Sequence, residues 1–198
     1  MTREELLQNY AAGNRDFSGV NLSNVDLSGV DLVDINLQGA NLEGTNFNGT
    51  NLNGADLCLS SPVGANLRGV NLRGANLTDA DLTYADLTGA DLSGANLTSI
   101  WLNYGILIGA KLQGARLLYA DLNDANLNKA DLTGADLSNA ELGNTNLEGA
   151  DLTGTNLKSA SLINANLNGA NLSDAYLKGT NLTDTKIDSN TNFGEAKF

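Results

Sequence analysis

The side chains best able to do chemistry in this sequence are carboxylates, because its 198 residues include 23 Asp and Glu, no His and one cysteine, Cys58. The absence of histidine excludes Ser-His-Asp and Cys-His catalysis and histidine-bearing zinc sites. The one cysteine cannot build a thiolate cluster, and with only Arg68 as a nearby base we expect it to be structural. Paired carboxylates could act as acid and base or bind Ca²⁺, so what matters is which elements would bring them together.

The acids recur inside a five-residue motif, A(D/N)LXX, of which residues 90–94, ADLSG, are one copy. Every fifth residue from Phe17 to Ile187 falls in the same frame, and of these 35 positions 31 are Leu, two Phe, one Ile and one Pro. A strand repeats every two residues and a helix every 3.6, so neither keeps this leucine on one face. The chain must bend once per quintet, and 27 of 35 quintets place Gly, Asn or Asp, which tolerate positive φ, two residues after the central position. Such regular bending predicts a solenoid whose coils stack about 4.8 Å apart.

The A(D/N)LXX array resembles the pentapeptide repeat family, most of all its cyanobacterial members with a short N-terminal capping helix. The resemblance implies an all-β solenoid, a right-handed quadrilateral β-helix of about 8–9 coils with twenty residues each. At that period Asp131 stacks on Asp151 and Asp121 on Glu141, on a smooth convex wall without an insertion that could form a cleft. We therefore expect no catalytic residues, no metal site, no cofactor and no enzymatic activity.

A short helical cap is predicted at residues 2–13. Thr2 can cap a helix, and acidic residues follow in its first turn, where they favour the helix dipole. Apolar residues at helical spacing form one face, and Gly13 ends the helix. This face would cover the first coil, whose inner corners carry larger residues than the alanines of later coils: Val20, Val25, Val30 and Ile35.

The unbroken frame predicts a single domain over residues 1–198, with repeat coils at 16–188. A local bulge is expected at residues 58–63, where Pro62 occupies an inward position and cannot donate a ladder hydrogen bond. Near residue 189 the frame slips by one, and two further quintets at 189–198 are expected to form a C-terminal cap. Their central residues are Phe193 and Phe198.

The formal net charge is −12 and the sequence pI about 4.1. Such a surface repels nucleic acid and anionic membranes, so we expect no direct nucleic-acid binding and no membrane association. No apolar run approaches membrane-spanning length, and the first residues lack the apolar segment of a signal peptide. Together with the single cysteine, these features favour a cytoplasmic location.

One coil, residues 100–119, departs from the motif because apolar and aromatic side chains take its outward positions. These side chains either fill the surface along neighbouring walls or form a contact site. Exposed apolar patches usually mark contacts, and Trp and Tyr are typical anchors, so we favour the contact site. The partner would be an unidentified protein or a second copy of the chain. The candidate partner-binding residues are Trp101, Tyr104, Ile106, Ile108, Leu118, Tyr119 and Tyr84.

The sequence thus predicts a non-enzymatic protein–protein interaction or regulatory scaffold, a rigid acidic rod with an apolar belt at residues 100–119. The resemblance implies an alternative, a DNA-mimicking inhibitor of a type II topoisomerase (gyrase), because the quinolone-resistance branch of the family is similar to duplex DNA in shape and charge. The net charge of −12 fits this alternative. The belt does not, because it interrupts the acidic surface whereas DNA is uniformly anionic.

Overall fold

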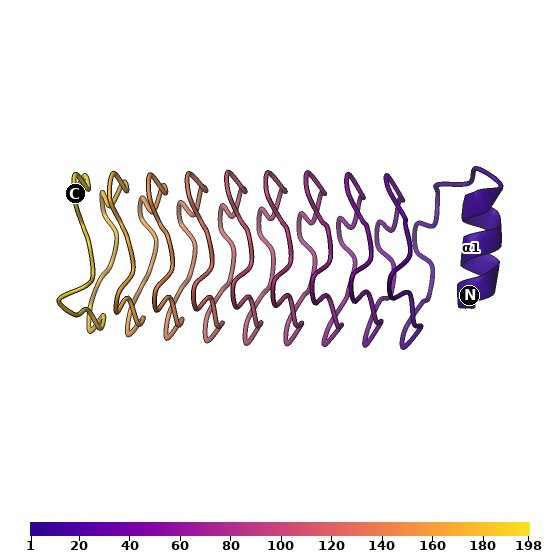
Figure 1. The fold of residues 1–198 in the computed structure, drawn as a ribbon, viewed down its shortest axis with the longest axis horizontal. Coiled ribbons are helices and arrows are strands. Elements are labelled where there is room, and N and C mark those ends of the chain that lie inside the picture. Colours follow the sequence, from indigo (N-terminus) through magenta and orange to yellow (C-terminus); the bar gives the residue numbers. More distant parts are fainter.

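The fold is a rod of stacked coils with one helix, α1 (Arg3–Ala11), lying across one end (Figure 1). The computed structural model describes residues 1–198. Outward residues twenty positions apart pair in parallel on adjacent coils, as Asp91 does with Lys111. These pairings are single bridges, so no wall contains a longer strand. The predicted right-handed quadrilateral β-helix with one short N-terminal helix is confirmed.

In a consensus quintet every backbone amide has an acceptor, which explains the repeated residue types. The amides of Asp91, Leu92 and Gly94 donate to carbonyl groups of neighbouring coils at 2.7–2.9 Å. The amide of Ser93 donates to Oδ1 of Asp91 at 3.1 Å. The amide after the leucine has no carbonyl acceptor on a neighbouring coil. Asp or Asn is favoured before the leucine because its side-chain oxygen accepts the hydrogen bond from this amide.

The leucines and the alanines two positions before them make up most of one continuous core of 56 buried residues. A fully buried leucine contributes roughly 1.5–3 kcal/mol, so the repeat supplies most of the stabilising burial. Where a buried threonine takes an inner corner, its hydroxyl donates to a carbonyl of the preceding coil, as Thr50 does to Leu27 at 2.6 Å. No buried side-chain polar atom lacks a partner.

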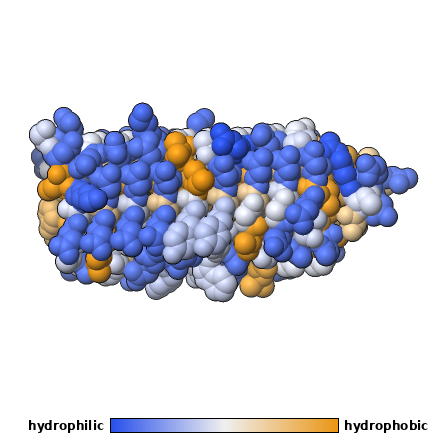
Figure 2. Space-filling view, turned by 90° about the horizontal axis from the view of Figure 1, so that it is seen from below, coloured by the Kyte–Doolittle hydropathy of each residue, from blue (hydrophilic) through white to orange (hydrophobic).

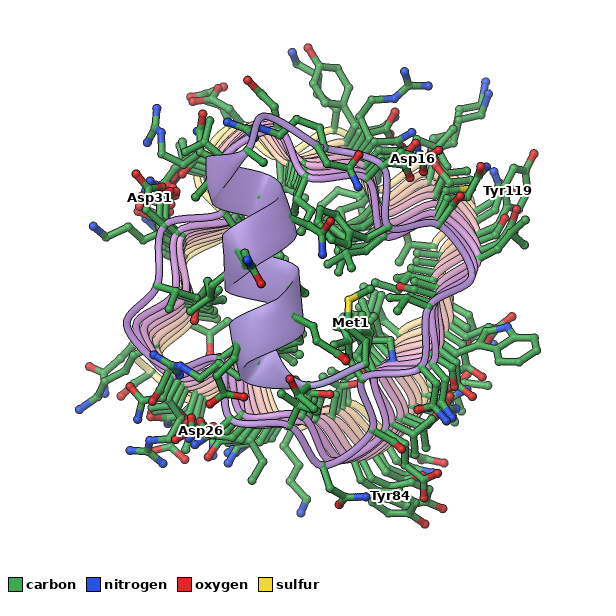
Figure 3. All side chains as sticks on the ribbon, turned by 90° about the vertical axis from the view of Figure 1, so that its right-hand side faces the viewer. Met1, Asp16, Asp26, Asp31, Tyr84 and Tyr119 are labelled. Atoms are coloured by element: carbon green, nitrogen blue, oxygen red, sulfur yellow. The ribbon has the colours of Figure 1, made fainter.

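Four walls enclose this core, as the view along the axis shows (Figure 3). We name the walls after the outward residues that pair between coils, and each name recurs every twenty residues. Wall A begins at Asp16, wall B at Asn21, wall C at Asp26 and wall D at Asp31. A corner takes the letters of the walls that it joins, so corner BC lies between walls B and C.

The helix α1 closes its N-terminus with a capping box, and Arg3 Nη1 ties it to the first coil by donating to the carbonyl of Asp26 at 2.7 Å. Thr2 Oγ1 accepts from the amide of Glu5 at 3.2 Å, and the Glu5 carboxylate accepts from the amide of Thr2 at 2.8 Å. Leu6 is fully buried, and the hydroxyl of Tyr10 donates to the carbonyl of Val33 at 2.8 Å. The three valines at inner corners of the first coil are partly buried and, like Leu7 and Tyr10 of the helix, pack against the core.

The bulge expected at residues 58–63 is absent, and the wall keeps its regular turns there. Pro62 is buried in the frame of the leucines. Its missing N–H is the one that would reach the carbonyl of Asp81, and the pairing of Ser61 with Asp81 is lost as a result. The prediction was wrong because proline removes only this one hydrogen bond and leaves the path of the chain unchanged.

The last two quintets pair with the coil before them at a spacing of 21, as Asn192 does with Asn171, so the structure contains the one-residue slip. Phe193 packs against the core. Phe198 lies beside it with ring centroids 6.2 Å apart, but it is 76% exposed. Only Phe193 therefore covers the last coil.

Candidate functional site

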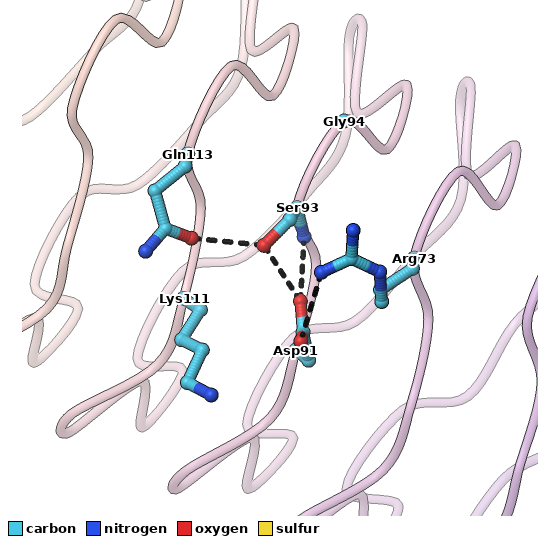
Figure 4. A pocket seen from close by; sticks show the side chains of 6 residues that line it. All are labelled: Arg73, Asp91, Ser93, Gly94, Lys111 and Gln113. Atoms are coloured by element: carbon cyan, nitrogen blue, oxygen red, sulfur yellow. Dashed lines mark hydrogen bonds and ion pairs between the residues drawn. The ribbon is translucent and has the colours of Figure 1, made fainter.

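The most hollowed part of the surface is an open polar depression of about 530 Å³ (Figure 4). Its lining residues are Arg73, Asp91, Ser93, Gly94, Lys111 and Gln113. Asp91 accepts from the hydroxyl of Ser93 at 2.6 Å and from the guanidinium of Arg73 at 3.4 Å, so its carboxylate is held by structural partners. The hydroxyl of Ser93 is shared between Asp91 and Gln113 at 2.6 and 2.8 Å, and the depression offers an open polar surface.

The stacked carboxylates lie where the period of twenty puts them, since Asp131 pairs with Asp151 and Asp121 with Glu141. Oδ1 of Asp131 accepts from the amide and hydroxyl of Thr133 at 3.0 and 2.7 Å. No group of three or more acidic or cysteine side chains is arranged to hold a metal ion. The three aspartates therefore serve the turns of their own quintets, whereas after Glu141 the amide of Gly143 donates to Asn123 instead.

The coil at residues 100–119 is the one place where four successive quintets lack the Asp or Asn that caps the wall. The amides that lose this acceptor donate to no other group of the protein. The four substituted positions are Trp101, Ile106, Lys111 and Arg116. The four amides belong to Asn103, Ile108, Gln113 and Leu118. Each lost hydrogen bond is worth about 0.5–1.5 kcal/mol, so this coil is locally less favourable than its neighbours.

Four aromatic side chains gather on wall B and its two corners. The indole of Trp101 projects from wall B and is 57% exposed. Tyr84 and Tyr104 lie on consecutive coils at corner BC, and Tyr119 lies at corner AB. Figure 3 shows Tyr84 and Tyr119 at opposite edges of this wall, pointing away from the core. An incoming partner would meet all four rings on one side of the rod.

The tyrosines occupy backbone conformations that suit glycine better. Tyr84, Tyr104 and Tyr119 have φ values of 61°, 59° and 57°. The left-handed region costs an L-residue roughly 1–2 kcal/mol, and most quintets place Gly, Asn or Asp there. The aromatic side chains are therefore retained against the local preference of the backbone.

The aliphatic candidates lie on other walls. Ile106 and Ile108 are each 37% exposed on wall C, next to the tyrosines of corner BC. Leu118 is half-buried on wall A. On wall D the same coil presents Lys111 and Gln113 instead. The candidate residues thus form an arc over walls A, B and C, and Figure 2 shows apolar patches that interrupt the hydrophilic surface halfway along the rod.

Charge is unevenly divided among the walls. Wall B and its two corners carry seven acids and no Lys or Arg. All 11 bases lie near the N-terminal helix, on walls A, C and D, or at corner CD. The acids of wall B and its corners are Glu43, Asp79, Asp81, Asp121, Asp124, Glu141 and Asp184. The aromatic rings therefore sit on the one wall that has no positive charge of its own.

On wall C, beside the arc, Asp86 shows how this fold holds an acid. Partial burial acts to raise the pKa of Asp86, but hydrogen bonds from the hydroxyl and amide of Thr88 and from Arg68 outweigh it, so the pKa lies below its ordinary value. Arg68 Nη1 lies 2.9 Å from Oδ2 of Asp86. The carboxylate is thus stabilised in its charged form.

Besides Ile187, which stands in the inward frame of the sequence but is 58% exposed, sequence reasoning missed two exposed apolar side chains outside the arc. Leu59 lies at corner AB with a φ of 58° and is 60% exposed, and a leucine at a turn position of the frame was a visible signal for it. Tyr176 is exposed on wall A, where the Lys197 ammonium lies 4.3 Å from its ring centroid. Neither lies on wall B near Trp101.

Comparisons with known proteins agree with this architecture. A profile of pentapeptide repeats matches in eight copies at residues 16–54, 63–98, 106–144, 130–169 and 145–184. No curated protein sequence matches the chain significantly. No helix of the structure has the length and apolar character that crossing a membrane requires.

Two solved structures are similar along most of their length. HetL, a pentapeptide repeat protein from the cyanobacterium Nostoc sp. strain PCC 7120 that is involved in the regulation of heterocyst differentiation, is 32% identical. The match covers 100% of this chain and 94% of HetL, with a TM-score of 0.63. QnrB1, a plasmid-mediated fluoroquinolone resistance protein, is 22% identical over 83% of this chain and 94% of its own, with a TM-score of 0.53, which shows a shared fold alone. With its quintet frame, its four-sided coils and these matches, the chain belongs to the pentapeptide repeat family.

Proposed function

We propose that the protein is a non-enzymatic regulator that acts by binding another protein through the arc of residues on the coil at 100–119 together with Tyr84. The observation that carries this proposal is the concentration of locally unfavourable choices on that coil. Four amides lose their side-chain acceptors, and exposed tyrosines occupy left-handed positions. Residues that conflict with the local rules of a regular fold concentrate at functional sites, because a requirement other than stability retains them.

The similarity to HetL supports a regulatory role, since it extends over the whole chain at 32% identity and HetL takes part in regulating differentiation. A rod with one core and no cleft suits a protein that presents a fixed surface. Its only cysteine, Cys58, is free, which is consistent with the reducing cytoplasm that we propose as its location.

Inhibition of a type II topoisomerase by DNA mimicry is the second candidate. The observations that favour it are the net charge of −12 and the absence of Lys and Arg from wall B. Duplex DNA is anionic on every side. In this protein Lys and Arg side chains lie on three of the four walls, and aromatic rings interrupt the acidic surface of the fourth. A gyrase supercoiling assay separates the two functions: we expect no inhibition at micromolar protein, and potent inhibition would replace our proposal with this one.

The test of the proposed function is a pull-down with the wild type beside a Trp101→Asn/Ile106→Asn/Ile108→Ser variant. Asn and Ser are residues that the repeat itself uses at these positions, so the variant should fold. A matched control is Asn171→Gln/Ser173→Thr on wall D, far from the arc. We expect the wild type and the control to retain the same specific partner and the arc variant to lose it. Equal retention by all three proteins would show that the arc is surface filler.

A further inference from the structure

The wall on which Trp101 lies lacks the side-chain ladder found on the other three. On walls A, C and D an Asn amide donates to the carboxylate one coil away. Asn36 does so to Asp16 at 3.1 Å on wall A. The corresponding bonds on walls C and D are Asn46 to Asp26 at 2.9 Å and Asn51 to Asp31 at 2.8 Å. Wall B has no such bond, because its paired positions near the centre are Asp, Trp, Asp and Glu.

Trp101 pairs with Asp81 on one adjacent coil and with Asp121 on the other. Oδ1 of Asp81 accepts from Thr83, and Oδ1 of Asp121 accepts from Asn123. The second oxygen, Oδ2, has no hydrogen-bond or ion-pair partner in either residue. The exposed indole is therefore flanked on both sides by a charged oxygen that nothing in the chain binds.

The chain itself shows that side-chain N–H donors bind such an oxygen: an arginine in two residues, and the Gln113 amide at Oδ2 of Asp131. Asp86 and Asp91 use Oδ1 in the same way, and in both residues Oδ2 accepts from an arginine. Arg68 Nη1 lies 2.9 Å from Oδ2 of Asp86, and Arg73 Nη1 lies 3.4 Å from Oδ2 of Asp91. Asp81 and Asp121 present the same acceptor without an arginine nearby.

Two tyrosines elsewhere in the chain are also covered by cations of the chain. The Arg15 guanidinium lies 3.7 Å from the ring centroid of Tyr10, and Lys197 covers Tyr176. No cation covers Trp101 or the tyrosines at the two corners of wall B. Guanidinium groups stack on indole faces and bind carboxylates through a planar fork, so one arginine can use both features of this wall.

We infer that wall B binds an arginine-rich segment of a partner protein, with guanidinium groups on Trp101 and on the free oxygens of Asp81 and Asp121. The inference rests on the proposed function and names the chemistry of its partner. Asp81 and Asp121 are two coils apart, about 10 Å at the spacing between strands. A polyproline segment rises about 3.1 Å per residue with three residues per turn, so arginines three residues apart face one side at a matching distance of roughly 9 Å.

The experiment uses the full chain and a proline-rich peptide that carries two arginines three residues apart. Trp101 is the only tryptophan, so its fluorescence reports peptide binding at this wall directly. For variants that lack Trp101, isothermal titration calorimetry measures the affinity for the peptide. Peptides in which Lys or Glu replaces both arginines are the comparison ligands. We expect saturable binding of the arginine peptide, affinity several-fold weaker for the lysine peptide, and no binding of the glutamate peptide.

The variants separate a specific site from general attraction to an acidic rod. Asp81→Asn/Asp121→Asn and Trp101→Asn should each weaken binding about tenfold or more, because they remove the ion pairs and the ring. Asp131→Asn/Asp151→Asn on wall D removes the same charge and should bind like the wild type.

Equal weakening in both double variants, equal affinity for the lysine and arginine peptides, or no binding at all would overturn the inference. Self-association that Trp101→Asn abolishes, without peptide binding, would assign the wall to a second copy instead. The proposed function is tested separately. If the arc variant loses its partner in the pull-down while the arginine peptide fails to bind, the proposed function stands and this inference falls.

Discussion

The rings of Tyr84 and Tyr104 stack on consecutive coils, with centroids 5.1 Å apart and planes inclined by 11°. The spacing of the coils places the rings at this distance, and both residues hold a left-handed backbone to reach it. Tyr119 holds the same conformation at corner AB and stacks on no other ring. The three tyrosines therefore share a backbone cost, and only two of them recover part of it through stacking.

This difference predicts that the same substitution, tyrosine to glycine, has different effects on stability at the two positions. Tyr119→Gly should raise the free energy of unfolding by about 1 kcal/mol, because it relieves the left-handed strain and loses no ring contact. Tyr104→Gly should leave it nearly unchanged, because the lost stacking, worth about 0.5–1.5 kcal/mol, offsets the relief. Urea denaturation measures both. Gly94→Ala is the control: the site has open space and a φ of 67°, so alanine should destabilise by about 1 kcal/mol. A Tyr119→Gly protein less stable than the wild type would contradict this account.

The coil at 100–119 should become no less stable when it is returned to the repeat consensus. In Trp101→Asn and Ile106→Asn the new side chain can accept from the amides of Asn103 and Ile108. Each hydrogen bond contributes about 0.5–1.5 kcal/mol, which offsets the loss of partly exposed apolar contacts. Thermal denaturation of each variant checks this, and partner capture should fall in the same proteins. A large loss of stability would instead show that these side chains are needed to hold the walls together.

Pro62→Leu should stabilise the protein by about 1–2 kcal/mol. Leucine restores the hydrogen bond to the carbonyl of Asp81 and fits the buried frame that the other coils use. Chemical denaturation gives the change, and hydrogen exchange at residue 62 should show a protected amide. An unchanged or lower stability would mean that the local backbone is fitted to proline.

The low pKa of Asp86 predicts an acid-dependent loss of stability. A carboxyl group whose pKa is lower in the folded than in the unfolded protein contributes stability that is complete above the unfolded value of 3.8 and is lost as the pH falls through the folded value. Thr88→Val removes the hydroxyl that donates to Asp86 at 2.6 Å and should raise its pKa. Carboxyl NMR titration measures the shift. Thr78→Val, whose hydroxyl donates to the amide oxygen of Asn76, should leave the pKa of Asp86 unchanged; the same shift in both variants would disprove the assignment.

Much of the fold follows from the sequence, because the residue types within each quintet define its local conformation. The central leucine sets what faces inward, the Asp or Asn before it caps the wall, and the residue two after it sets the bend. Thr2 and Gly13 likewise mark a helix that the structure contains. The number of walls does not follow from a period of five, and here it came from the family resemblance.

The arrangement of the site was harder to predict, because it depends on the number of walls per coil. Residues 100–119 were visibly unusual, but only the paired coils show that Trp101 and Ile106 lie on different walls. The separation of charge also depends on this register, since residues of wall B are twenty apart and never neighbours in the sequence. The bulge predicted at Pro62 was wrong for a physical reason. The sequence shows that proline lacks an N–H donor, but it does not show that the surrounding coils keep their path without that hydrogen bond.

The most direct test of the central claim, that wall B at Trp101 meets a protein partner, is site-specific photocrosslinking in cells. A photoreactive phenylalanine analogue at position 101 should crosslink to one protein, attached within an arginine-rich segment, and added arginine peptide should compete with it. The same analogue at position 171 on wall D should give no such product. Equal crosslinking from both positions, or none from position 101 in a cell extract where the pull-down detects a partner, would contradict the claim.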